Sequence, residues 1–323
     1  MKYFFVSFSV FVSSLLAQEA GCELSFLDIG AGARARALGN AFVGIADDAN
    51  AVFWNPSGIV SLEGPMITGM HSSLFFGTKF DYLAVAAPLT RIYTDNDTDG
   101  YRYGIGIAYI RASTGDIPLT EQGSDTIPGT NYPEIVYNGT AEFTSNTGII
   151  SFGTQVFNRL NLALISRLNH IKLAKFTGSG INFGIATLLA ITRIGADNDM
   201  DTRGNTFKIG ITLQDLLPLK LKWSNDFEEK VLPAANLGCS FEFRKKILLS
   251  GVLKQTLASG HHPGYGLGLE WKPVVVLPIR FGIEDKNFST GAGFLSRRVS
   301  LDYTIYIHRE LPLSQYLSIG LRL

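Results

Sequence analysis

The stretch YGLGLEWK, residues 265–272, alternates strictly between large apolar side chains and small or charged ones. Successive side chains of a strand point to opposite sides, so the four large ones share one face: Tyr265, Leu267, Leu269 and Trp271. A period of two residues predicts a strand. The stretch therefore indicates β structure with one wholly apolar face.

The same pattern returns along most of the chain. It is clear in residues 101–109, 206–213, 299–308 and 316–323, where glycine, hydroxyl or charged residues occupy the second face. The spacing between residues 66 and 323 predicts about 14 strands, an even number as in bacterial outer-membrane barrels. We expect an all-β transmembrane antiparallel barrel with the apolar face toward lipid and the polar face lining the lumen.

A secreted soluble β-sandwich is the alternative fold, because its strands alternate in the same way. Two features favour the barrel. The strands are long enough to cross the hydrocarbon layer when tilted, and aromatic residues such as Tyr109 and Trp271 recur near strand ends, where an interfacial girdle needs them.

The first residues have the composition of a secretory signal. Lys2 precedes an apolar run from Phe4 to Leu16, and small and polar residues follow. We expect a signal peptide over 1–17, cleaved after Ala17; a lipoprotein signal ending at Cys22 is the alternative. An exported barrel would reside in the bacterial outer membrane, with membrane lipid as its surroundings.

Residues 18–65 interrupt the alternation before the barrel of 66–323 begins. Between Leu38 and Val52 the apolar residues have helical spacing, and Pro56 should end that helix near Trp54. We expect this segment to be a short, partly helical hatch in the lumen; an arm outside the barrel is the alternative. Strand glycines such as Gly104, Gly106, Gly210, Gly266, Gly268 and Gly282 favour the lumen, because they let another backbone approach closely.

Residues 32–59, GARARALGNAFVGIADDANAVFWNPSGI, resemble the N-terminal signature of the FadL-like outer-membrane proteins, and more closely that of their PorV/PorQ branch. The likeness rests on Gly32-Ala33-Arg34, Ala46-Asp47-Asp48 and Asn55-Pro56-Ser57, with serine where alanine is usual. Residues 232–243 and the C-terminal strands are also similar. The resemblance implies a 14-stranded barrel with an N-terminal hatch. It also implies passage of apolar molecules by hatch rearrangement and an opening in the wall or, in the PorV branch, a part in type IX secretion.

Three groups of site residues follow from the pattern and the resemblance. Hatch and gating roles fall to Asp47, Asp48, Phe53, Trp54, Asn55, Pro56, Ser57 and Gly58. Candidate ligand contacts are Phe42, Val52, Phe53 and Trp54. The lumen-facing residues are Arg102, Gly104, Gly106, Glu270, Arg280 and Asp302, and the outward loops are expected at 93–100, 112–138, 195–205 and 224–232.

Other functions have little support. The chain carries 28 basic and 28 acidic residues, so no basic excess favours nucleic acid. Asp95, Asp97 and Asp99 have the spacing of half a calcium loop but lack its glutamate, which makes them a weak metal candidate. We expect no cofactor, and the absence of hydrolase motifs predicts that the chain is not an enzyme.

Two functions remain open. In the first, small hydrophobic molecules cross the outer membrane through a hatch-gated lumen, and an apolar pocket should then lie beside the hatch aromatics. In the second, the protein is a secretion-linked component that binds exported proteins. A tightly filled lumen is expected there.

Overall fold

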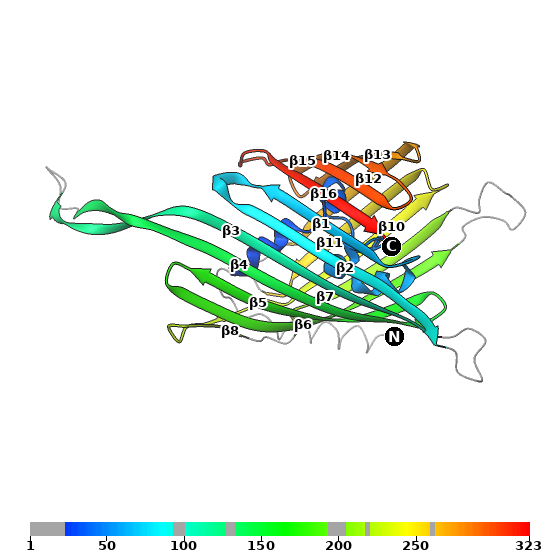
Figure 1. The fold of residues 1–323 in the computed structure, drawn as a ribbon, viewed down its shortest axis with the longest axis horizontal. Coiled ribbons are helices and arrows are strands. Elements are labelled where there is room, and N and C mark those ends of the chain that lie inside the picture. Colours follow the sequence, from blue (N-terminus) through cyan, green and yellow to red (C-terminus); the bar gives the residue numbers. More distant parts are fainter. Residues whose placement is uncertain (1–22, 93–100, 127–132, 193–204, 217–219, 259–261) are drawn as a thin grey trace, which may run out of the picture.

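The computed structural model describes residues 23–92, 101–126, 133–192, 205–216, 220–258 and 262–323. Within them the chain forms a closed antiparallel barrel of 14 strands (Figure 1). The first and last strands close the ring, from Met66 opposite Arg322 to Ser73 opposite Gln315. The predicted barrel and strand number are confirmed. Among these residues no helix is both long and apolar enough to cross a membrane.

The wall strands follow one another in sequence order around the ring, apart from one short hairpin. They are β1 (Met66–Ser73), β2 (Lys79–Ile92), β3 (Tyr101–Thr126), β4 (Pro133–Phe157), β5 (Leu160–Leu173), β6 (Phe176–Thr192), β7 (Thr206–Gln214), β10 (Ala234–Phe243), β11 (Ile247–Thr256), β12 (Gly264–Val274), β13 (Leu277–Glu284), β14 (Asn287–Leu295), β15 (Val299–Ile307) and β16 (Ser314–Arg322). The hairpin consists of β8 (Lys220–Trp223) and β9 (Glu228–Lys230), and a 3-10 turn, η3 (Phe75–Gly77), joins β1 to β2.

The two faces of the wall are arranged as the alternation predicts. On β12, Leu267 is 54% exposed on the outside, whereas Glu270 on the inner face is fully buried. A soluble sandwich would show the reverse, with apolar side chains inside and polar ones in water. The sandwich alternative is therefore wrong.

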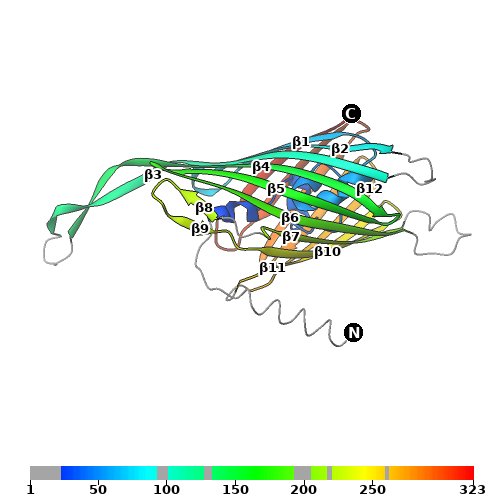
Figure 2. The same ribbon diagram turned by 90° about the horizontal axis from the view of Figure 1, so that it is seen from below.

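The four expected outward loops do not lie at one end. In an antiparallel barrel, successive connections between strands alternate between the two ends. The strands that flank 93–100 and 195–205 therefore meet at the end where β1 begins, called here the terminal end. The segments 112–138 and 224–232 lie at the other end, the ribbon end. Much of 112–138 is also strand rather than loop, because β3 and β4 extend far beyond the wall (Figures 1 and 2).

The N-terminal segment crosses the lumen (Figure 2). Its elements are η1 (Glu23–Ile29), α2 (Ala33–Ala37), α3 (Ala51–Trp54) and η2 (Pro56–Ser61), and residues 23–65 are called the hatch below. The predicted helix from Leu38 is wrong over most of its length, because left-handed backbone angles interrupt it at Gly39, Asn40 and Ala46. Its end at Trp54 is correct, since Asn55 before the proline is extended.

Several expectations concern residues outside the described part of the chain. These are the signal peptide, Cys22, and the acidic residues Asp95, Asp97 and Asp99. Among the described residues, no group of three or more histidine, cysteine, aspartate or glutamate side chains could hold a metal ion.

Candidate functional site

The hatch touches the wall where the inner strand positions are glycine. A Cβ on Gly282 would lie 2.2 Å from the backbone nitrogen of Gly39, and one on Gly266 would lie 2.2 Å from the carbonyl oxygen of the same residue. A Cβ on Gly210 would lie 2.3 Å from the carbonyl oxygen of Val43. No side chain fits at such distances without a shift of the backbone. The glycines thus allow main chain to pack on main chain across the lumen.

The turn at Asn55 clamps the hatch to itself and to the wall. The Asn55 side-chain amide donates to the carbonyl oxygens of Val43, at 2.8 Å, and of Thr187 on β6, at 3.1 Å. Its side-chain oxygen accepts from the Ser57 backbone and hydroxyl. Pro56 starts η2, and Gly58 packs so tightly that a Cβ would meet the Ala46 carbonyl oxygen at 2.1 Å. This turn is fully inside the molecule.

A first charge cluster joins the hatch to the wall at Glu270. Arg34 of the hatch donates to Glu270 at 2.9 Å and to Asp47 at 2.6 Å, and it also reaches Asp48 at 3.0 Å. Arg280 donates to Glu270 from the wall at 2.6 Å. Burial by itself would raise the pKa of Asp47, but the positive charges of Arg34 and Lys208 and the hydrogen bond from Arg34 together outweigh it, so this pKa lies below the usual range.

The same cluster continues along the inner wall. Arg280 donates to Asp302 on β15 at 2.6 Å, and Lys272 lies 3.1 Å from Glu270. Glu270 and Arg280 are fully buried, and buried charges need partners of opposite sign. Glu270, Arg280 and Asp302 therefore form one chain of ion pairs on the inner wall, and the hatch arginine Arg34 joins it at Glu270.

A second charge cluster surrounds Glu284 on β13. Arg36 and Asn40 of the hatch donate to its carboxylate at 3.0 and 2.8 Å. From the wall, Lys254 and the hydroxyl of Tyr306 donate to it as well. The Arg36 guanidinium also lies 3.9 Å from the centre of the Tyr306 ring. Two arginines of one short helix, α2, thus attach the hatch to different wall strands.

The expected ligand contacts are packed rather than facing a cavity. Phe42 and Val52 are fully buried, and Phe53 and Trp54 are 5% and 6% exposed. The Phe53 and Trp54 rings meet edge to face at 4.9 Å, and the Trp54 ring nitrogen donates to the Ala31 carbonyl oxygen at 2.8 Å. The hollows of appreciable size described below lie on the outer wall instead.

The remaining predicted residues lie on β3. Gly104 and Gly106 face the hatch, where a Cβ on Gly106 would meet Ile59 and Val52 at 2.6 Å. By alternation, Arg102 is on the same face of β3 as these glycines, but it stands at the beginning of the strand, where it is exposed. Arg102 therefore lies outside the two charge clusters.

A seam interrupts the strand ladder between β6 and β7. The pairing of β6 with β7 ends at Ile185 and Leu213, and its pairing with β8 begins at Ser179 and Lys222. Between these points the described residues show one backbone hydrogen bond across the seam, from the Leu216 nitrogen to the Phe183 oxygen at 2.9 Å. Among the described residues, which leave out 217–219, ladder hydrogen bonds are therefore fewer here than between the other neighbouring strands.

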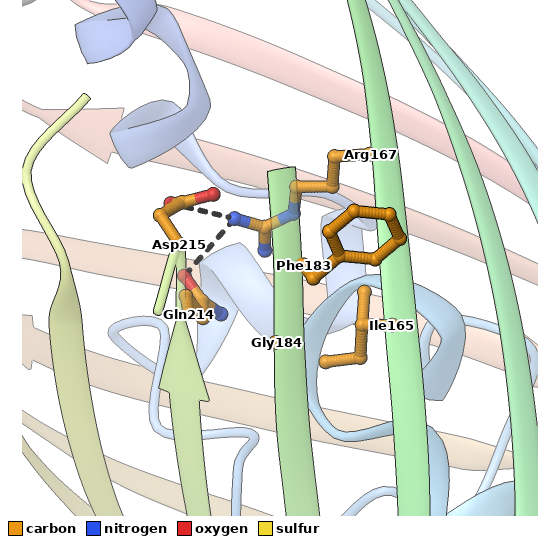
Figure 3. A pocket seen from close by; sticks show the side chains of 6 residues that line it. All are labelled: Ile165, Arg167, Phe183, Gly184, Gln214 and Asp215. Atoms are coloured by element: carbon orange, nitrogen blue, oxygen red, sulfur yellow. Dashed lines mark hydrogen bonds and ion pairs between the residues drawn. The ribbon is translucent and has the colours of Figure 1, made fainter. Parts of the chain in front are cut away.

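Polar side chains close the seam from the lumen side (Figure 3). Arg167 on β5 donates to Gln214 and Asp215, both at 3.3 Å, and Asn182 on β6 donates to Asp215 at 2.8 Å. The hollow between them has about 140 Å³ of empty space and no room for a water molecule. Asp215 has a left-handed backbone, with φ 56°, directly after the last residue of β7. The seam is closed in this structure.

An apolar hollow of about 370 Å³ lies on the outer wall beside the seam. Its lining includes Phe152, Leu162, Leu164, Ile185, Ile211 and Leu213. Ile185 and Leu213 are the last pair of the β6–β7 ladder, so the hollow reaches the edge of the seam. A second hollow, of about 590 Å³, lies over β11 to β15.

The sequence interpretation did not identify the seam residues. Arg167 stands on the lumen face of β5, where the other buried residues are apolar or asparagine. A single basic residue at such a position implies an acidic partner nearby. The partner, Asp215, lies 48 residues away at a strand end, and only the fold brings the two together.

No protein-family model and no curated protein matches the sequence. Solved structures of toluene transporters are similar in fold. TodX of Pseudomonas putida has 11% sequence identity and a TM-score of 0.55, with 91% of this chain and 99% of that chain covered. TbuX of Ralstonia pickettii has 11% identity and a TM-score of 0.55, covering 91% and 98%. The barrel implied by the FadL-like resemblance is thereby confirmed, while the PorV/PorQ branch stays a prediction.

Proposed function

We propose that the protein is a non-enzymatic outer-membrane barrel that passes small hydrophobic molecules by way of its lumen and the β6–β7 seam. The observation that carries the proposal is the seam itself, which adjoins an apolar hollow on the lipid side. A hollow of this size is within the range of small-molecule sites.

The electrostatics of the seam support a gate. Its outer side is apolar, with Phe183 and Leu216 exposed, and its inner side is held by the contacts of Arg167 with Asp215 and Gln214. Side-chain contacts of this kind break and re-form more readily than a continuous strand ladder. The hatch closes the lumen in the present state, so passage requires the seam and part of the hatch to move. The similarity in fold to toluene transporters supports the same proposal.

A reversible cross-link across the seam tests the proposal. Phe183→Cys with Leu216→Cys places thiols on neighbouring outward positions, in a background with Cys22→Ser and Cys239→Ser. A short reducible bis-thiosulfonate joins them in proteoliposomes. We expect uptake of toluene, the probe, to fall to the level of vesicles without protein and to recover after reduction.

A matched control places the same cross-link where the ladder is complete. Leu253→Cys with Tyr265→Cys also joins exposed outward neighbours, on β11 and β12. This cross-link should leave uptake unchanged. Equal uptake with and without the seam cross-link would overturn the proposed route, and absence of uptake by the wild type would overturn the function.

The second candidate function, a type IX secretion-linked component that binds exported proteins, is favoured by the packing of the lumen. Phe42, Val52, Phe53 and Trp54 leave no ligand-sized space beside them, as a scaffold would require. Rates of toluene uptake equal to those of protein-free vesicles would favour this candidate.

A further inference from the structure

Two strands leave the barrel at the ribbon end. The pairing of β3 with β2 stops at Ser113, and the pairing of β4 with β5 stops at Phe143. The pairs between β3 and β4 continue as far as Thr126 and Pro133. Residues 114–126 and 133–142, called here the acidic ribbon, project from the wall in both ribbon views (Figures 1 and 2). At about 3.3 Å per residue the ribbon is roughly 40 Å long.

Beyond its base, where Thr114 bonds to Thr78 and the Ala174 nitrogen donates to the Glu142 oxygen, the described residues of the ribbon are held by their own strand pairing. A two-stranded sheet is only marginally stable alone in water, and its outer edges present unpaired backbone groups. The two edges differ. β3 contains Pro118, which has no N–H, and Asp116, which has a left-handed backbone. Both interrupt its edge. Between 134 and 141, β4 has one left-handed residue, Gly139 with φ 93°, and no proline, so β4 offers the better template for another strand.

The ribbon carries charge of one sign. Between residues 112 and 158 the sequence has no lysine, arginine or histidine, and its five charged residues are acidic: Asp116, Glu121, Asp125, Glu134 and Glu142. The whole chain is balanced at 28 and 28, so this excess is local. A basic surface is the electrostatic complement.

Large apolar side chains are exposed on the same part of β4. Ile135 is 70% exposed and Tyr137 is 62% exposed, and Val136 between them is also exposed. These residues stand on the ribbon beyond Phe143, where β4 no longer pairs with β5. Exposed polar contacts near the ends of the wall strands, His71 with Asp81 and His170 with Ser179, indicate that the hydrocarbon layer ends below the ribbon. Apolar side chains gathered in water indicate an interaction site.

We propose that residues 134–141 of β4 are a docking edge for a basic segment of another protein, which adds to the ribbon as an extended strand. Main-chain hydrogen bonds to the free edge would supply affinity, and Ile135 and Tyr137 would contact the apolar side chains of the partner. The acidic residues select a lysine- or arginine-rich partner and repel anionic lipid headgroups. Longer connections of such barrels face outward, which places this edge outside the cell. The proposal does not rest on the passage of hydrophobic molecules, because the ribbon lies outside the lumen.

Peptide binding to the full chain in detergent micelles tests the docking edge. The probe is a nine-residue peptide of alternating lysine and valine, and the two controls are its glutamate–valine counterpart and the lysine–valine peptide with a central proline. We expect the probe to bind at least about tenfold more tightly than either control. Amide hydrogen exchange should slow at 134–141 when the probe is bound.

Two variants distinguish binding at the β4 edge from nonspecific electrostatic binding to the acidic ribbon. Ile135→Ser with Tyr137→Ser should weaken probe binding about tenfold. Phe227→Ser, at the exposed turn between β8 and β9, removes an aromatic from the same end and should leave binding unchanged. Retained heat-modifiable mobility on gels establishes that each variant is folded.

Three results would overturn the proposal. The first is equal binding of the glutamate–valine peptide, and the second is an equal effect of Phe227→Ser. The third is slowed exchange at 134–141 on addition of phosphatidylglycerol vesicles alone, which would assign the surface to lipid.

Discussion

At the scale of single residues, the glycines of the inner wall decide how closely the hatch can approach. Gly266, Gly268 and Gly282 lie side by side on β12 and β13 against the backbone of residues 37–39 of the hatch. Glycine in a strand is ordinarily unfavourable. Here the missing side chain makes room for another main chain. The packing of the hatch against the inner wall offsets the lower stability of a strand that contains glycine.

Gly282→Ala should destabilise the barrel by about 1–3 kcal/mol, because the new methyl group would overlap the backbone nitrogen of Gly39. Gly148→Ala is the matched control, since a Cβ there makes an ordinary contact with Leu168 at 3.9 Å. Urea unfolding in micelles measures both. Similar stability of the two variants would contradict main-chain packing at β13.

Leu269→Arg places a charge on the lipid face. Leu269 is a partly exposed outward residue of β12 that lines the outer hollow of β11 to β15. Near the membrane midplane such a charge should raise the free energy of the inserted barrel by about 2–4 kcal/mol. Folding into lipid vesicles measures the change, with Leu269→Met as the size-matched control. Unchanged insertion would mean that this face does not meet hydrocarbon.

At the scale of elements, the hatch behaves as a filling of the lumen rather than as part of the wall. It makes few regular helical turns, and strand side chains bond to its backbone, as when Ser240 donates to the Gly44 carbonyl oxygen and Thr304 to that of Ala33. The helical spacing from Leu38 to Val52 therefore reflects which residues are buried, not a continuous helix.

Deletion of residues 32–59 should leave a folded barrel that leaks small polar solutes. The wall ladder does not pass through the hatch, and the glycine-lined lumen would be open. Pro56→Ala should act in the same direction but more weakly, because the remaining contacts of Asn55 still hold the turn. Swelling of proteoliposomes in sugar solutions measures the leak. A deletion variant as tight as the wild type would argue against the hatch as the barrier.

At the scale of the whole molecule, long-range pairing decides where function can lie. Arg167 and Asp215 meet because β7 ends at Gln214, at the edge of the seam. β3 and β4 leave the wall because their pairing with β2 and β5 ends before their own pairing does. Both features arise from differences in strand length around the ring. The periodicity of a single strand contains no information about the length of its neighbours.

The predicted site residues show the same limit. Glu270, Arg280 and Asp302 could be assigned to the lumen from alternation alone, and they lie there. The hatch partner of Glu270, Arg34, comes from a segment more than 200 residues away in sequence, and alternation does not identify it. Alternation likewise does not say whether Trp54 borders a pocket or is packed, as it is here, because packing against the wall is a property of both surfaces.

The sequence by itself determined the barrel, its lipid-facing side and the presence of a separate hatch, because these depend on local period and on the positions of glycine and proline. The tertiary structure decided which charges pair, where the strand ladder is interrupted and which end carries the acidic ribbon. Those features depend on the register between strands that are far apart in the chain. The free energy that sets a register belongs to a pair of strands, so the sequence of one strand alone does not determine it.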